Sequence, residues 1–217
     1  GLADSIKRNF ESKGGKITIV AAHEDGKGDY SAEVAALAQA SGDILIVAGY
    51  LDQGGKGIIQ TSLDIGAFDK FFLPDGMIGD ALPKAIGSDL NGSIGSVPGT
   101  DSPGASKYSD LAKANGFKSG PYGPESYDGA ALIMLAMEAS KSTNSNVFKK
   151  HVMDVANAPG VKIYPGELSK AIKLIKEGKA IDYVGATDLE FVGSGESSGS
   201  FAEILIDNGK VNKVGYR

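Results

Sequence analysis

The sequence predicts an α/β fold, and three observations support that prediction. Short, unbroken apolar runs at residues 16–22 and 43–49 are typical of buried parallel strands. Segments whose apolar residues recur at helical spacing lie between these runs, and alternating strands and helices indicate parallel βαβ units. The 31 glycines fall mostly between the periodic segments, as expected for a fold with many short turns.

The first third of the chain carries the clearest alternation. Leu2, Ile6 and Phe10 recur at helical spacing, and Gly14-Gly15 ends that run. Because the chain opens within this helix, without a capping residue, we expect an upstream part to be missing. Strands are predicted after it at 16–22, 43–49 and 71–73. Helices are predicted from Tyr30 to Ala38, with Asp29 or Ser31 as the cap, and from about 56 to 66.

The middle and the end of the chain differ in character. Residues 91–124 are rich in Gly, Ser and Pro, with one short strand and one short helix, and predict a crossing between two lobes. Three helices should follow in a region without a strong strand, which is a second indication of missing chain. The last two strands should form a hairpin through Asp207-Asn208-Gly209. The predicted helices span 127–140, 146–157 and 167–178, and the strands 200–206 and 210–216.

Composition excludes several classes of function. The net charge is −5 with acids and bases well mixed, so nothing indicates nucleic-acid binding. The absence of cysteine excludes disulfides, thiolate nucleophiles and Cys-based zinc sites. No apolar run approaches the roughly 20 residues needed to span a bilayer, and no signal peptide is recognisable. We therefore expect no membrane insertion.

Two sequence patterns resemble enzyme motifs without their usual context. Gly195-Glu-Ser-Ser-Gly199 fits the nucleophile elbow, but a strand follows it, and both histidines lie upstream, so a surface loop is favoured. Gly54-Gly55-Lys56-Gly57 precedes a helix whose N-terminal N–H groups could hold an anion, but the segment lacks the Walker and dinucleotide spacings. It leaves open an enzyme that acts on a phosphorylated substrate, although a helix start beside a polar ligand is favoured.

The remaining candidates for chemistry predict no active site. His23 and His151 share no metal-ligand spacing, and a metal site would need more donors than they provide. His23 is expected to be a solvated loop residue. We therefore predict no catalytic residue, no metal and no cofactor, and a function in binding rather than catalysis.

Tyr50 and Asp75 stand out by position, since each follows the carboxyl end of a predicted parallel strand. Ligands of open α/β sheets bind outside those ends. An aspartate there can hold an ammonium group, and a tyrosine offers a stacking face and a hydroxyl. The alternative is that Asp75-Gly76 is a plain turn after Pro74 and Tyr50 a partly buried loop aromatic. Position alone leaves both interpretations open.

An ordered series of short motifs adds a resemblance to a known family. The chain resembles the extracellular ligand-binding proteins of branched-chain amino-acid ABC transporters, the type I periplasmic binding proteins of the Leu/Ile/Val-binding family. The motifs run along nearly the whole chain in the family's order and spacing. They are Gly1-Leu-Ala-Asp4, the Gly14-Gly15 helix end, Asp29-Tyr30-Ser31, Val47-Ala-Gly-Tyr50, Leu73-Pro-Asp-Gly76, the helix that begins Tyr127-Asp-Gly-Ala-Ala-Leu, and Tyr183-Val-Gly-Ala-Thr187.

The resemblance implies two Rossmann-like lobes joined by three crossing strands, with the first lobe incomplete. Residues 1–97 and 198–217 would form the second lobe, and 98–197 the rest of the first lobe with its hinge crossings. Tyr50 matches the tyrosine that lines the ligand from the second lobe. Asp75, with Gly76 beside it, matches the acidic residue that holds the ligand's α-ammonium group. Leucine-binding members carry a glutamate there.

The function implied is that of a periplasmic or extracellular substrate-binding component of an ABC transporter. It would bind an amino acid or a similar small polar solute and present it to a membrane permease. The alternative is a ligand-sensing receptor domain of the same fold for amides or for organic or aromatic acids. The family's early strands, which supply hydroxyl and N–H groups to the ligand carboxylate, have no counterpart here. The chain is thus expected to be a fragment that holds the amine-binding half of a site.

Overall fold

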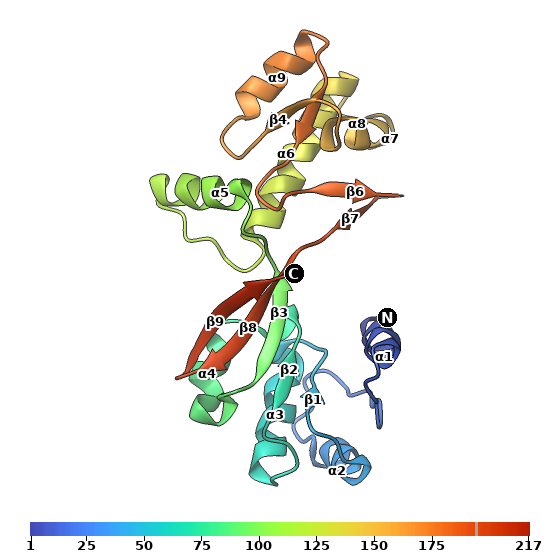
Figure 1. Ribbon diagram of the computed structural model, residues 1–217, viewed down its shortest axis with the longest axis vertical. Coiled ribbons are helices and arrows are strands. Elements are labelled where there is room, and N and C mark those ends of the chain that lie inside the picture. The colour runs from blue at the N-terminus through green and yellow to red at the C-terminus, as the bar shows by residue number, and fades with distance from the viewer. Residues whose placement is uncertain (194) are drawn as a thin grey trace. The chain divides into compact units, whose positions relative to one another are not determined.

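The computed structural model describes residues 1–193 and 195–217 (Figure 1). Residue contacts divide the chain into two compact units. Unit 1 contains Gly1–Val97 and Ala202–Gly215, and unit 2 contains Pro98–Phe201 with Tyr216–Arg217. The chain therefore passes from one unit to the other after Val97, after Phe201 and after Gly215. Each unit has its own cluster of buried apolar side chains.

Unit 1 is built on a five-stranded sheet in the order β1-β2-β3-β8-β9. Strands β1 and β2 run parallel, with Leu45 opposite Phe71, and β2 and β3 run parallel, with Phe72 opposite Ile94. The carboxyl ends of these three strands consequently lie at the same edge of the sheet. The strands are β1 (Leu45–Ile46), β2 (Phe71–Leu73), β3 (Ile94–Pro98), β8 (Phe201–Asp207) and β9 (Lys210–Tyr216).

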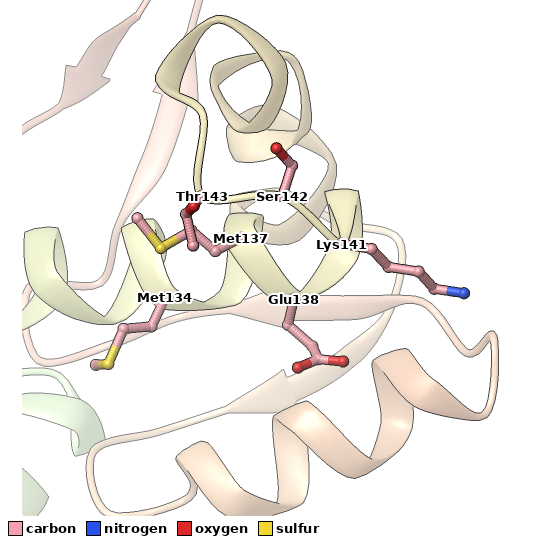
Figure 2. Close-up of a pocket in the computed structure, with 6 residues that line it drawn as sticks. All are labelled: Met134, Met137, Glu138, Lys141, Ser142 and Thr143. Carbon is pink, nitrogen blue, oxygen red and sulfur yellow. The ribbon is translucent and has the colours of Figure 1, made fainter.

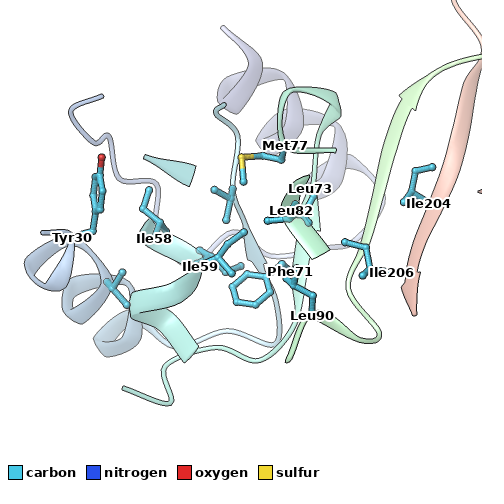
Figure 3. Close-up of a cluster of buried hydrophobic side chains, with 13 residues drawn as sticks. Tyr30, Ile58, Ile59, Phe71, Leu73, Met77, Leu82, Leu90, Ile204 and Ile206 are labelled. Carbon is cyan, nitrogen blue, oxygen red and sulfur yellow. The ribbon is translucent and has the colours of Figure 1, made fainter. Parts of the chain in front are cut away.

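Helices of unit 1 supply the rest of its core (Figure 3). Phe71 and Leu73 of β2 are fully buried, and Ile59 of α3 packs in the same cluster. In contrast, α1 has no buried residue. The helices are α1 (Leu2–Ser12), α2 (Ser31–Ala40), α3 (Gly55–Asp64) and α4 (Ala81–Ile86), with the 3-10 turns η1 (Leu51–Gln53), η2 (Asp75–Met77) and η3 (Gly87–Leu90).

The prediction of a buried strand at 16–22 is wrong. The segment forms no strand in the described structure, and Ile19 and Val20 are exposed. The hydroxyl of Thr18 donates a hydrogen bond of 2.7 Å to the carbonyl of Ser41, which attaches the segment beside the end of α2. Apolar, β-branched composition makes a strand favourable only where a neighbouring strand pairs with its backbone. Of the run at 43–49, only Leu45–Ile46 is strand, paired with Phe71 and Phe72.

The C-terminal hairpin is confirmed. The turn between β8 and β9 places Asn208 at φ 51° and Gly209 at φ 69°. Two consecutive positive φ angles fit a type I′ turn, whose twist matches that of the flanking strands. Phe201 and Arg217 exchange two backbone hydrogen bonds of 2.8 Å at the other end of the pair, as antiparallel neighbours do.

Unit 2 contains the predicted helices together with short strands that the sequence did not reveal. Of these strands only β4 (Val161–Ile163) lies within the helix-rich region that was predicted to carry no strong strand. It forms a parallel pair with β5 (Ile181–Tyr183), and β6 (Glu190–Val192) and β7 (Glu196–Ser198) form an antiparallel pair. Strands of three residues are too short to show a period. The helices are α5 (Pro103–Ala114), α6 (Gly123–Ser140), α7 (Ser145–Phe148), η4 (Lys149–His151), α8 (Val152–Ala156) and α9 (Leu168–Lys176).

No helix in the described part of the chain combines the length and the apolar character needed to cross a membrane. The longest one, α6, has a buried face that includes Leu132 and Leu135 and an opposite face on which Ile133 and Met134 are about half exposed.

Candidate functional site

Two predicted site residues lie at the carboxyl edge of the parallel strands in unit 1. Tyr50 comes after β1 and immediately before η1, in extended backbone conformation, and its side chain is 62% exposed. Asp75 follows Pro74 after β2 and is the first residue of η2. Since β1 and β2 are parallel neighbours, the two turns begin at the same edge of the sheet.

Gly76 brings these two turns into contact. A Cβ atom on Gly76 would lie 2.6 Å from the carbonyl oxygen of Gly49 and 3.0 Å from Cδ1 of Tyr50. Both distances are too short for a real side chain. The turn after β2 therefore rests directly on the Gly49 carbonyl and on the ring of Tyr50, and this position requires glycine because of the close approach.

The backbone of Tyr50 is held in place although its side chain is exposed. Its carbonyl accepts hydrogen bonds from the N–H groups of Gln53 (3.2 Å) and Gly55 (3.1 Å). Gly55 in turn packs closely against the side chain of Met77. Met77 is the last residue of η2, and its side chain is buried in the core. The aromatic ring of Tyr50 thus projects from a rigid turn.

The glycines at positions 54 to 57 have a packing explanation. Gly54 has φ +119°, and a Cβ there would lie 2.5 Å from the hydroxyl of Tyr30. A Cβ on Gly57 would lie 2.8 Å from the same ring. These residues let the start of α3 approach the buried Tyr30, so close packing accounts for the glycines and the disfavoured anion cradle gains no support.

His23 joins the same edge, and the prediction that it is a solvated loop residue is wrong. Its side chain is only 19% exposed. The imidazole meets the ring of Tyr30 edge to face, with centroids 5.8 Å apart, and its Nε2 lies 3.4 Å from where a Cβ of Gly49 would be. Residues 16–22, which precede His23, form no strand in the described structure, so the positional rule that pointed to Tyr50 and Asp75 does not account for it.

Replacing Gly76 by alanine is expected to lower the free energy of unfolding by about 1–3 kcal/mol, because the new methyl group would overlap the Gly49 carbonyl and the Tyr50 ring. Chemical denaturation followed by circular dichroism measures the change. Gly79→Ala is the matched control, since no atom lies within 4 Å of its Cβ position, and it should shift stability by less than about 0.5 kcal/mol. Equal effects of the two variants would contradict the proposed contact.

Unit 2 contains a buried carboxylate with a complete set of donors. Asp128 of α6 is 2% exposed and accepts hydrogen bonds from the Tyr183 hydroxyl (2.9 Å), from the N–H of Ala186 (2.8 Å) and from both the N–H (2.9 Å) and the hydroxyl (2.7 Å) of Thr187. Burial, reinforced by the Asp128 charge, raises the pKa of Tyr183 far above its ordinary value, so this hydroxyl stays a donor. Every donor comes from the protein, which indicates a structural role.

Other features of unit 2 offer no site chemistry. A shallow surface hollow at the end of α6 is lined by two methionines and by Glu138, whose carboxylate lies 4.0 Å from Lys176 outside the hollow. It holds none of the predicted site residues (Figure 2). The Gly195–Gly199 motif lies on the exposed strand β7. Among the described residues no group of three or more His, Cys, Asp or Glu side chains is placed to hold a metal ion. The residues that line the hollow are Met134, Met137, Glu138, Lys141, Ser142 and Thr143.

Comparisons with known sequences identify distant relatives. The chain is 28% identical over 148 residues to the Leu/Ile/Val-binding protein homolog 1 of Brucella suis biovar 1 (strain 1330), a match that covers 67% of this chain and 39% of that protein. It is also 28% identical over 160 residues to the Leu/Ile/Val-binding protein homolog 2 of Brucella abortus (strain 2308), covering 73% and 41%. No protein-family model matches the chain.

Solved structures show the same fold. The leucine binding protein LivK of Thermotoga maritima MSB8 matches 100% of this chain with a TM-score of 0.75 at 16% identity. LivJ of Streptococcus pneumoniae, solved with isoleucine, gives 0.63 over 96% at 18% identity, and a solute binding protein of R. palustris, solved with 4-hydroxybenzoate, gives 0.65 over 99% at 16% identity. The chain spans 54–56% of these three structures, so it corresponds to about half of each.

Proposed function

Because this chain is a distant homologue of the Leu/Ile/Val-binding proteins and has the α/β fold of type I periplasmic binding proteins over about half their length, we propose that it belongs to the substrate-binding component of an ABC transporter. Its solute is an amino acid or a similar small polar molecule. Residues 1–97 and 198–217 serve as the second lobe, and 98–197 as part of the first. The protein works outside the cytoplasmic membrane and delivers its solute to a membrane permease.

The observation that carries this proposal is the packed arrangement of Tyr50, Asp75 and Gly76 at the carboxyl edge of the sheet. A carboxylate at this position suits the ammonium group of an amino acid through charge-assisted hydrogen bonds. The exposed ring of Tyr50 adds an aromatic face. Gly76 has no side chain to block the approach of a ligand, and it fixes the spacing between the other two residues.

The three chain passages between the units suit a binding protein that closes on its ligand. They follow Val97, Phe201 and Gly215, each in or directly beside a strand of the five-stranded sheet. In this mechanism, hinge closure around the solute creates the surface that the permease recognises. The binding energy goes into stabilising the closed state, and no covalent chemistry takes place.

The alternative is a receptor domain of the same fold for organic or aromatic acids. Solute binding proteins of ABC transporters with this fold were solved with 4-hydroxybenzoate or benzoate, which supports the aromatic-acid ligand of this alternative but not its receptor role. In that case, Tyr50 stacks on an aromatic ring, and Asp75 accepts a hydrogen bond from a hydroxyl group. The two candidates differ in whether the ligand needs an ammonium group.

Calorimetric titration of the complete protein that carries this chain tests the proposal. The panel contains isoleucine, other amino acids, 4-hydroxybenzoate and benzoate. We expect saturable binding of at least one amino acid and weaker binding of acids that lack an amine. Binding of the aromatic acids alone would support the ligand class of the alternative, and no binding of any member of the panel would overturn both.

A further inference from the structure

We infer that His23 is a third ligand contact, whose Nε2 accepts a hydrogen bond from the ammonium group of the solute. The inference rests on the proposed function and deepens it, because it specifies which hydrogen bonds hold the amine. It assigns a role to a residue that lies outside the predicted site.

The position of His23 follows from its contacts with Gly49. Nε2 of the imidazole lies 3.4 Å from the point that a Cβ atom on Gly49 would occupy. Gly76 packs on the carbonyl of the same Gly49. Tyr50 is the next residue in the chain. The loop that carries His23 and the turns after β1 and β2, which carry Tyr50 and Asp75, are therefore grouped around one glycine. Gly54 also leaves room for the ring, since a Cβ there would be 3.2 Å from Cε1 of His23.

The hydrogen bonding of the other ring nitrogen decides what Nε2 can do. Nδ1 lies 3.3 Å from the carbonyl oxygen of Glu24 and 4.0 Å from a carboxylate oxygen of Asp25. Both oxygens are acceptors, so they favour the tautomer in which Nδ1 carries the proton. Nε2 is then left with its lone pair at the edge that faces Gly49. The ring offers an acceptor, not a donor, to the site.

The ring is also held in its orientation before a ligand arrives. Tyr30, which is 3% exposed, packs edge to face against it at an interplanar angle of 86°. The Tyr30 hydroxyl donates to the Glu24 carbonyl at 3.1 Å and accepts from the N–H of Lys27 at 3.0 Å, which ties the loop that carries His23 to the start of α2. A preorganised acceptor loses little side-chain entropy on binding.

The chemistry of the grouped residues defines the class of ligand. A carboxylate, an imidazole acceptor and a phenol hydroxyl together suit a group that donates several hydrogen bonds and carries positive charge. A primary ammonium group has three N–H donors and fulfils both conditions. A carboxylate of the solute has no proton to donate to Nε2 and would be repelled by the negative charge of Asp75. This edge therefore disfavours the acid end of a solute.

The test compares His23→Phe and His23→Gln in the complete protein, with isoleucine as the probe and 3-methylpentanoate as its amine-free counterpart. His23→Phe keeps an aromatic ring but removes the acceptor, and we expect its Kd for isoleucine to rise about five- to tenfold. His23→Gln places a carbonyl oxygen near the position of Nε2 and should retain most of the affinity. Affinity for 3-methylpentanoate should not fall in either variant. His151→Phe, at a partly exposed histidine of unit 2, is the control and should bind like the unmodified protein.

Each outcome separates this inference from the proposed function. Unchanged isoleucine affinity in His23→Phe, or equal losses in the Phe and Gln variants with thermal unfolding unchanged, would overturn the role of Nε2 while leaving the binding function intact. If the unmodified protein binds no amino acid, the proposed function fails first and the inference fails with it.

Discussion

Replacing Asp128 by alanine should lower the free energy of unfolding of unit 2 by about 4 kcal/mol, because it removes a buried acceptor from several donors at once. The Tyr183 hydroxyl, the N–H of Ala186 and both donor groups of Thr187 would lose their partner inside the protein. Gly185, at φ +63°, already lies too close to Asp128 for a side chain, so the loop after β5 is built around this carboxylate.

Denaturant unfolding followed by far-ultraviolet circular dichroism measures the effect on stability. Asp128→Asn is expected to be intermediate, since it keeps the size and one acceptor oxygen but turns an amide NH2 toward backbone donors. Asp110→Ala on the exposed side of α5 is the control and should change stability by less than about 0.5 kcal/mol. A loss below about 1 kcal/mol for Asp128→Ala would show that the network is not the main attachment of this loop.

Asp75→Asn should weaken the binding of isoleucine about 30-fold, a loss of about 2 kcal/mol, because the ammonium group would exchange a charged acceptor for a neutral one. The substitution hardly changes the volume of the side chain, so the turn at η2 and its contact with Tyr50 should persist. Calorimetry on the complete protein gives the Kd directly. The affinity for 3-methylpentanoate should rise or stay the same, since this solute has no amine and the acidic group near it is gone.

A matched change of charge separates a direct contact from a general electrostatic effect. Asp89→Asn removes one negative charge from an exposed position of η3 in the same unit and should leave the Kd for isoleucine within about twofold. If both variants weakened binding equally, the overall charge of the unit would explain the result. If Asp75→Asn bound isoleucine as before, Asp75 would be a turn residue without a role in the site.

The elements that the sequence predicted correctly are those whose evidence is local. Helical spacing identified α1, α2, α3 and α9 because a helix satisfies its backbone within its own segment. The strand Phe71–Leu73 was also predicted, since its apolar residues are bounded by turn residues, and the Asn208-Gly209 turn has its own chemical signature.

The site was only partly accessible from the sequence. The rule that ligands bind beyond the carboxyl ends of parallel strands pointed to Tyr50 and Asp75, and the structure places both at that edge. It could not show that Gly76 sits on the Gly49 carbonyl or that His23 turns Nε2 toward the same glycine. Those contacts join residues 26 and 27 positions apart in the chain, and the pattern of a single sequence does not show which distant residues meet.

The sequence by itself determined the α/β class, the helices, the hairpin and a resemblance to amino-acid-binding proteins, because composition, period and turn residues act over a few positions. Only the tertiary structure decided that residues 16–22 remain unpaired while equally apolar Leu45–Ile46 form a strand. The physical reason is that a strand takes its hydrogen bonds from another segment, so its existence depends on what lies beside it. The site depends on tertiary structure in the same way, because His23 comes close to Tyr50 only through its contact with Gly49.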